Sequence, residues 1–316
     1  MMCAILLRKL SANSFRVLFA VLLPALAACG SGSGASGGGD PSAPPCPSGQ
    51  PVVVAVENSW GSIANQLGGD RVCVRSFIVN PDTDPHAYEA KPSDARLIAT
   101  AQYVIVNGAG YDPWAPKLIA ANPVSGRRVL TVGELVGKKE GDNPHLWYSP
   151  DYVARVIEKI NADLDALDPQ DASYFDEQKT QYLTVGLKDY LGTLATIRLK
   201  YHGTPVGATE SIFVYLADAL DLNLVTPPDY MKAVSEGTDP SAADKATIER
   251  QISNRSIKVF VFNSQNSSKD VVALVDKARA QKIPVAQVTE TLTPAGATFQ
   301  GWQTRQLQGL LAVLGG

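Results

Sequence analysis

The sequence predicts an α/β fold made of two similar lobes, each a four-stranded parallel sheet flanked by helices. Short runs of β-branched residues alternate with amphipathic stretches, which is the pattern of parallel strands covered by helices on both faces. The alternation occurs twice, and a long helical stretch without strand signals separates the two occurrences. The predicted strands cover residues 51–56, 72–79, 103–107 and 127–132 in the first set, and 205–209, 223–227, 257–262 and 284–288 in the second.

Local signals mark where the helices of the first lobe begin and end. An amphipathic stretch over residues 59–67 is ended by two glycines, and a helix over 93–101 begins directly after a proline. Ser149 is a capping residue followed by a proline at the first helical position. A third helix therefore begins there and continues to residue 167, where Asp168 and a further proline end it.

Residues 171–199 have the apolar spacing of one long helix. At about 1.5 Å per residue, such a helix spans more than about 40 Å. We therefore predict one long rigid helix that joins the lobes and leaves a cleft between them. The predicted organisation is an N-terminal lobe over 51–168, the linking helix over 169–200 and a C-terminal lobe over 201–316.

The N-terminus has the features of a secreted, lipid-anchored protein. Residues 1–28 contain three basic residues, an apolar run and a small-residue end, with no acid, which is typical of a signal peptide. Leu26-Ala27-Ala28-Cys29 has the form of a bacterial lipobox, in which lipid is attached to the cysteine; an ordinary cleavage site followed by a free thiol is the alternative. Residues 29–50 form a flexible tether rich in glycine, serine and proline. We expect an extracytoplasmic protein anchored to the bacterial cell membrane.

Net charge and cysteine count give two further expectations, one about binding partners and one about a disulfide. The formal net charge of the chain is −3 and becomes more negative once the basic signal is removed, which argues against binding to nucleic acid. Cys46 and Cys73 remain after the signal and the lipidated Cys29 are set aside. Because neighbouring parallel strands would bring them together in an oxidising compartment, we expect a disulfide; two separate buried thiols are the alternative.

Four metal-competent residues follow strands of the predicted sheets. His86 follows the second strand, His145 follows the fourth, and Glu210 and Glu290 follow strands of the second lobe. Ligands of parallel α/β sheets bind beyond the carboxyl ends of the strands, and imidazole with carboxylate suits first-row divalent ions. The remaining histidine, His202, lies at the opposite end and is expected on the surface. On spacing alone, core histidines and surface acids are an equally good interpretation.

Several motifs resemble one family of transport proteins. The sequences DPHAYEAKPSD around His86, NGAGYDPW over 107–114, NPHLWYSP around His145 and EGTDPS over 236–241 are similar to those of metal-binding ABC-transporter solute receptors, the cluster often called A-I. The resemblance covers the chain from about residue 51 to its end and keeps the order of the motifs. It implies two α/β lobes, a long linking helix and a metal site in the inter-lobe cleft. The implied ligands are His86, His145, Glu210 and Glu290.

The chain departs from this family in ways that bear on the metal. Zinc members usually carry histidine where Glu210 stands, whereas manganese and iron members often carry glutamate, and the last acid is commonly aspartate rather than Glu290. The histidine-rich acidic loop of many zinc members is absent. Two carboxylates make the site harder, which favours manganese slightly over zinc, with ferrous iron as a third candidate.

Two further acids lie beyond strand ends. Glu57 and Asp112 are candidates for partners that orient the ligand histidines. An equally good interpretation is that they are acids at helix N-termini, where the helix dipole favours negative charge.

The leading hypothesis is a monomeric, non-enzymatic binding protein that captures a divalent transition metal and delivers it to an ABC permease and its ATPase. One alternative is a metal-dependent hydrolase, because a His/His/Glu set also builds catalytic zinc sites. No HExxH motif occurs in the chain, and four protein ligands would leave no open position. A second alternative is an adhesin-like surface lipoprotein in which the metal is structural.

Overall fold

The computed structural model describes residues 45–81, 88–266 and 268–315. The predicted signal peptide, the lipobox with Cys29, most of the tether and His86 lie outside the described residues. Within the described ranges, no helix is long and apolar enough to cross a membrane.

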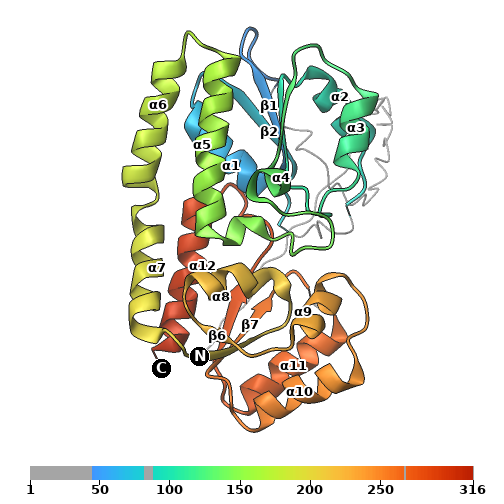
Figure 1. The fold of residues 1–316 in the computed structure, drawn as a ribbon, viewed down its shortest axis with the longest axis vertical. Coiled ribbons are helices and arrows are strands. Elements are labelled where there is room, and N and C mark those ends of the chain that lie inside the picture. Colours follow the sequence, from blue (N-terminus) through green and yellow to red (C-terminus); the bar gives the residue numbers. More distant parts are fainter. Residues whose placement is uncertain (1–44, 82–87, 267, 316) are drawn as a thin grey trace, which may run out of the picture. The chain divides into compact units, whose positions relative to one another are not determined.

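Both predicted four-stranded parallel sheets are confirmed (Figure 1). The N-terminal sheet has the order β2-β1-β3-β4 and the C-terminal sheet the order β6-β5-β7-β8, so the two lobes repeat one topology. Every neighbouring pair is parallel, with registers such as Val52 opposite Cys73 and Phe260 opposite Val285. The strands are β1 (Val52–Glu57), β2 (Cys73–Ile78), β3 (Tyr103–Val106), β4 (Arg128–Thr131), β5 (Pro205–Ala208), β6 (Asn223–Leu224), β7 (Val259–Asn263) and β8 (Val285–Val288).

Helices and short 3-10 turns connect the strands of each lobe, as parallel pairing requires. Ser149 caps the helix that it was predicted to begin, since its side chain accepts a hydrogen bond from the amide of Tyr152. The N-terminal lobe contains α1 (Asn58–Gly68), α2 (Pro92–Thr100), α3 (Ala115–Ala121), α4 (Val132–Val136), the 3-10 turn Leu146–Tyr148 and α5 (Pro150–Leu167). The C-terminal lobe contains the 3-10 turn Ser211–Phe213, α8 (Val214–Ala219), α9 (Pro228–Ser235), α10 (Ala242–Ser253), α11 (Lys269–Ala280) and α12 (Phe299–Leu314).

The predicted linking helix contains a π-helical turn and is therefore not one regular α-helix. The segment consists of α6 (Ala172–Gln181), a π-helical turn (Tyr182–Gly186) and α7 (Lys188–Tyr201). Tyr182 and Leu187 are both buried although they are five residues apart, a spacing that turns them onto different faces of a regular α-helix. In the π turn, the amide of Leu187 donates to the carbonyl of Tyr182 at 2.9 Å, which keeps both side chains on the buried face.

The last helix, α12, packs against elements of both lobes. It contacts α7, β8 and α1, and Figure 1 shows it beside α7. At its start, the amide of Phe299 donates to Ser62 Oγ at 2.8 Å, and the side chains of Gln66 and Gln300 are hydrogen-bonded to each other. Residues of the predicted C-terminal lobe therefore complete the packing of α1 in the N-terminal lobe.

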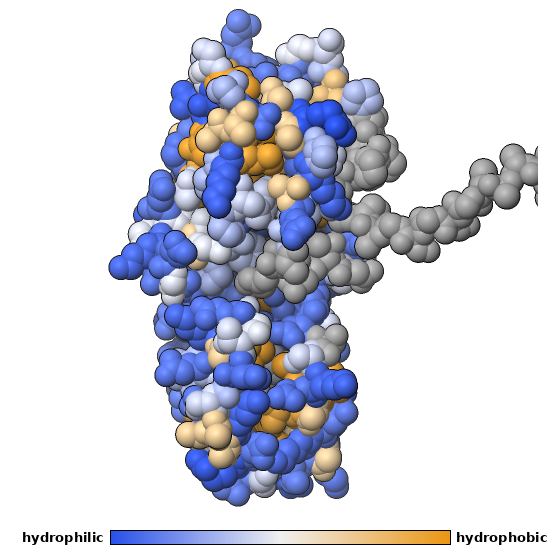
Figure 2. Space-filling view, turned by 90° about the vertical axis from the view of Figure 1, so that its right-hand side faces the viewer, coloured by the Kyte–Doolittle hydropathy of each residue, from blue (hydrophilic) through white to orange (hydrophobic). Residues whose placement is uncertain are grey.

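One hydrophobic core continues through both lobes. A single cluster of buried residues includes Trp60 and Trp147 from the first lobe and Trp302 and Phe299 from the second. The rings of Tyr148 from the first lobe and Trp302 from the second are in contact, with centroids 5.7 Å apart, so moving the lobes widely apart would expose apolar surface that is now buried. A second, smaller cluster covers the other face of the N-terminal sheet. The described surface seen in Figure 2 is largely hydrophilic, with hydrophobic residues in small groups.

A disulfide joins Cys46 to Cys73 in the structure. Cys73 is the first residue of β2 and lies opposite Val52 of β1, so the bond ties the segment before β1 to the neighbouring strand. The expected loss of stability on removing such a bond is about 3 kcal/mol, because the closed loop restricts the unfolded chain.

Candidate metal centre

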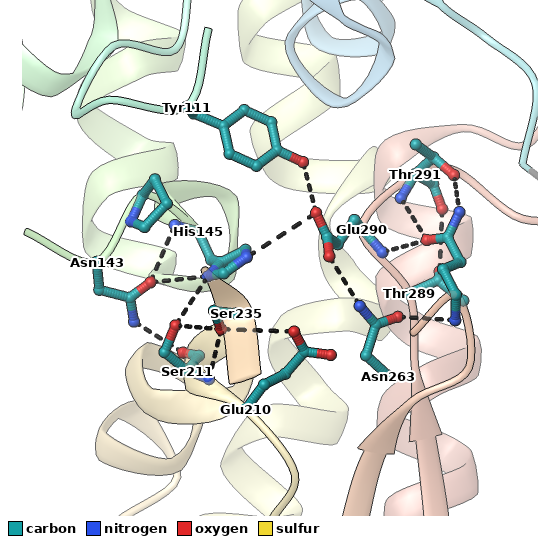
Figure 3. Close-up of polar contacts among 12 residues, drawn as sticks. Tyr111, Asn143, His145, Glu210, Ser211, Ser235, Asn263, Thr289, Glu290 and Thr291 are labelled. Atoms are coloured by element: carbon teal, nitrogen blue, oxygen red, sulfur yellow. Dashed lines mark hydrogen bonds and ion pairs between the residues drawn. The ribbon is translucent and has the colours of Figure 1, made fainter. Parts of the chain in front are cut away.

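Side chains from four strand ends meet between the two sheets. Tyr111 follows β3, Asn263 is the last residue of β7, and Glu210 and Glu290 each lie two residues beyond β5 and β8. His145 lies farther along the chain, after β4 and α4, immediately before the 3-10 turn Leu146–Tyr148. Because both sheets are parallel, their carboxyl ends deliver these side chains to one region, as Figure 3 shows.

His145 is completely buried among aromatic rings. Its ring centroid lies 5.6 Å from that of Trp147 and 6.0 Å from that of Tyr111, both in edge-to-face geometry. Its Nδ1 lies 2.8 Å from Asn143 Oδ1. The opposite ring nitrogen, Nε2, lies 3.9 Å from Glu290 Oε2. The predicted ligands His145 and Glu290, from different lobes, are therefore brought together.

Glu290 is held by polar groups from both lobes. The hydroxyl of Tyr111 donates to Glu290 Oε2 at 2.7 Å, and the Asn263 side-chain amide donates to Oε1 at 2.8 Å. The Glu290 backbone amide donates to Gln265 Oε1 at 2.5 Å. These bonds offset the free-energy cost of burying the carboxylate and fix its orientation.

Glu210 is connected to His145 through two serine hydroxyls. Ser235 Oγ donates to Glu210 Oε2 at 3.4 Å and lies 2.8 Å from Ser211 Oγ, which in turn lies 3.5 Å from His145 Nδ1. Glu210 is also buried, and Figure 3 shows its carboxylate near the other two predicted ligands. A cavity of about 490 Å³ adjoins this side of the site, and Asn143, Ser211 and Ser235 form part of its wall.

The described residues supply part of the predicted ligand set. Among them, no group of three His, Cys, Asp or Glu side chains could hold a metal ion as arranged here. The remaining predicted ligand, His86, lies outside the described ranges. His202 is exposed at the end of α7, as expected for a residue without a role in the site.

Asp112 supports the site through the backbone. Its carboxylate accepts hydrogen bonds from the amides of Asn107 and Gly108 at 2.7 and 2.8 Å. The side chain of Asn107 then donates to the carbonyl of Pro144, next to His145, at 2.9 Å. Asp112 thus holds the turn that carries Tyr111 and contacts the His145 loop through Asn107.

Glu57 is buried beside Asp112. Burial first, and then the negative charge of Asp112, raise the pKa of Glu57 well above its ordinary value of 4.5. Burial also raises the pKa of Asp112, but the two backbone amides oppose that shift. Hydrogen bonding between the Glu57 and Asp112 side chains raises the pKa of Glu57 further. We therefore expect Glu57 to be protonated and to donate to Asp112.

Tyr111, Asn143 and Asn263 were not identified as site residues from sequence. Tyr111 and Asn143 belong to the motifs NGAGYDPW and NPHLWYSP, so membership in these motifs could have identified them as candidate site residues. Asn263 ends a strand of the second sheet without any motif around it. Its role is visible only from its hydrogen bond to Glu290.

A buried, protonated Glu57 predicts a pH-dependent stability. The unfolded chain ionises Glu57 near its ordinary pKa of 4.5, whereas the folded chain keeps the proton, so the free energy of unfolding should fall as the pH rises above 4.5. The slope for one such group approaches about 1.4 kcal/mol per pH unit. Glu57→Gln can still donate to Asp112 but carries no titrating proton, so it should lose this component of the slope.

Urea unfolding between pH 4.5 and 7 measures this difference. Glu177→Gln is the matched control, because Glu177 is exposed on α6. Stability profiles of wild type and Glu57→Gln that stay parallel across this range would show that Glu57 is ionised in the folded protein.

Comparison with known proteins places the fold and the motifs in a family. The family model described as zinc-uptake complex component A, periplasmic (ZnuA), matches residues 53–313. A manganese-bound periplasmic metal-binding protein from Candidatus Liberibacter asiaticus shares the fold, with a TM-score of 0.68 and 21% identity, over 84% of this chain and 100% of that chain.

Two curated relatives are named for binding different metals. The zinc-binding lipoprotein AdcA of Streptococcus pneumoniae is 24% identical over 272 residues, which are 78% of this chain and 52% of the relative. The manganese-binding lipoprotein MntA of Halalkalibacterium halodurans is 28% identical over 136 residues, which are 42% of this chain and 44% of the relative. The aligned regions thus span about half of each relative. The family match covers most of the present chain, which belongs to the ZnuA family of periplasmic zinc-uptake complex components.

Proposed function

We propose that this protein is the extracytoplasmic solute-binding component of a metal ABC transporter. It captures manganese or zinc, with ferrous iron as a third candidate, and delivers the ion to a membrane permease driven by its ATPase. We further propose that it acts as a monomer without enzymatic activity, anchored to the membrane by lipid on Cys29. The ligand set that we propose is His86, His145, Glu210 and Glu290.

One observation carries the proposal: His145 and Glu290 come from different lobes and meet in a buried site with Nε2 and Oε2 3.9 Å apart. An imidazole and carboxylates suit a first-row divalent ion. Tyr111 and Asn263 hold Glu290, so the carboxylate is positioned before an ion arrives. Asn143 does the same for His145.

Metal content and competitive calorimetry of the purified protein test the function. We expect reversible, saturable binding of one ion per chain, no hydrolysis of ester or peptide substrates, and loss of metal uptake in cells that lack the protein. Hydrolysis dependent on the bound metal would favour a metal-dependent hydrolase. An ion that cannot be removed without unfolding the chain would favour a structural metal.

The choice of metal is expected to depend on Glu210. A carboxylate can provide one or two oxygen ligands, whereas histidine provides one nitrogen and approaches the tetrahedral set that zinc prefers. Glu210→His should therefore raise the affinity for zinc relative to manganese by at least about tenfold, which equals about 1.4 kcal/mol. Competition titrations of both metals against wild type and variant measure this ratio.

Glu236→His is the matched control for the added imidazole, because Glu236 is exposed near the same cavity. If Glu210→His weakened both metals equally, the geometry between the lobes, and not the ligand at position 210, would set the selectivity.

A further inference from the structure

Asn143 makes hydrogen bonds in two directions, toward His145 and toward the other lobe. Its Oδ1 lies 2.8 Å from His145 Nδ1 and accepts from the His145 amide at 3.2 Å. Its Nδ2 donates to the backbone carbonyl of Ser211 at 2.7 Å. Figure 3 shows Asn143 with a dashed line to each of these two residues.

The carbonyl of Ser211 and the backbone amide of His145 together orient Asn143, and this orientation selects the tautomer of His145. A carbonyl can only accept, so the NH₂ group of Asn143 must face Ser211 and its oxygen must face His145. An amide oxygen also only accepts, so the neutral imidazole must carry its proton on Nδ1. The lone pair then lies on Nε2, the nitrogen that faces Glu290.

The same contacts connect this tautomer to the loop that carries Glu210. Ser211 follows Glu210 directly, and its amide donates to Ser235 Oγ at 3.0 Å, the hydroxyl that also donates to Glu210. A second contact holds the loops together, because the hydroxyl of Tyr215 on α8 donates to the Asn143 carbonyl at 2.8 Å. A displacement of the Glu210 loop would therefore remove the acceptor of the Asn143 NH₂ group and leave the His145 amide as the other contact that orients this side chain.

We propose that Asn143 is a positioning residue that couples the two lobes: docking of the Glu210 loop against its NH₂ group selects the metal-binding tautomer of His145. This inference rests on the proposed function and deepens it. Metal binding by His145 in the N-terminal lobe then depends on the position of the Glu210 loop in the C-terminal lobe. Withdrawal of that loop removes Glu210 and weakens binding by His145 at the same time. Loss of such a partner of a ligand histidine typically lowers metal affinity about 10- to 100-fold.

Nitrogen-15 NMR of the metal-free protein tests the tautomer directly. With only three histidines in the chain, His145 can be assigned from its own substitution. At pH 8 we expect the Nδ1–H form in wild type. Asn143→Ala should shift His145 toward the Nε2–H form that imidazole favours in water, whereas Asn143→Asp keeps an acceptor and should retain Nδ1–H.

Measurements of Mn²⁺ affinity distinguish the contact of Asn143 with His145 from its contact with Ser211. Asn143→Asp loses the donor to Ser211, so it should bind Mn²⁺ at least about tenfold more weakly than wild type although its tautomer is retained. Tyr215→Phe keeps the Asn143 side chain and should have a smaller effect. Thermal unfolding of each metal-free variant shows whether it is folded, and Asn143 is only half-buried, so substitution there leaves the core intact.

Two results would overturn the inference. The first is an unchanged Nδ1–H tautomer in Asn143→Ala, and the second is wild-type affinity of Asn143→Asp for Mn²⁺. If wild type bound neither Mn²⁺ nor Zn²⁺, the proposed function would fail, while the NMR measurement would still decide the tautomer.

Discussion

His145→Ala is expected to lower the affinity for the transported metal more than 100-fold, or by more than about 2.7 kcal/mol. The substitution removes the Nε2 ligand that faces Glu290, and no other described imidazole lies at the site to replace it. The same loss is expected for His86→Ala, on the sequence prediction alone. Competitive titration with Mn²⁺ and Zn²⁺ measures both variants.

The structure adds a cost in stability that the sequence did not predict. His145 lies in a loop, yet it is completely buried against Trp147 and Tyr111. Its replacement by alanine should cost about 2 kcal/mol or more of unfolding free energy because a cavity remains. His145→Phe keeps a ring without nitrogen ligands, so it should lose metal and retain most of the stability. His202→Ala is the surface control; wild-type affinity in both His145 variants would remove this residue from the ligand set.

Glu290→Gln is expected to have the second-largest effect, again a loss of more than about 100-fold in metal affinity. The substitution removes the charge but keeps the shape and an oxygen that can accept from Tyr111 or Asn263. Stability of the metal-free protein should therefore change little, since the hydrogen bonds can be rearranged. Calorimetric titration and urea unfolding of the same preparation measure the two quantities.

Tyr111→Phe is the matched comparison for Glu290→Gln. It leaves the carboxylate in place and removes only the hydroxyl that donates to it, so its loss of affinity should stay within about 100-fold. Equal losses in Tyr111→Phe and Glu290→Gln would indicate that Glu290 acts by holding the lobes together and not as a ligand.

The sequence by itself determined the two sheets and the places where the candidate ligands leave them. Strand and helix signals are local: β-branched runs, proline starts and glycine ends lie within a few residues of the elements they specify. His145, Glu210 and Glu290 could therefore be assigned to the carboxyl ends of strands, and the general rule for parallel sheets placed them at one edge.

Only the tertiary structure decided how these residues are held. Tyr111 and Glu290 are separated by 179 positions, and Asn143 and Ser211 by 68, so no local pattern encodes their hydrogen bonds. The π turn after α6 likewise arises because Tyr182 and Leu187 must both be buried, a demand set by the core that they join. Periodicity reports which face of an element is apolar, but contacts between distant segments depend on how the packed lobes meet.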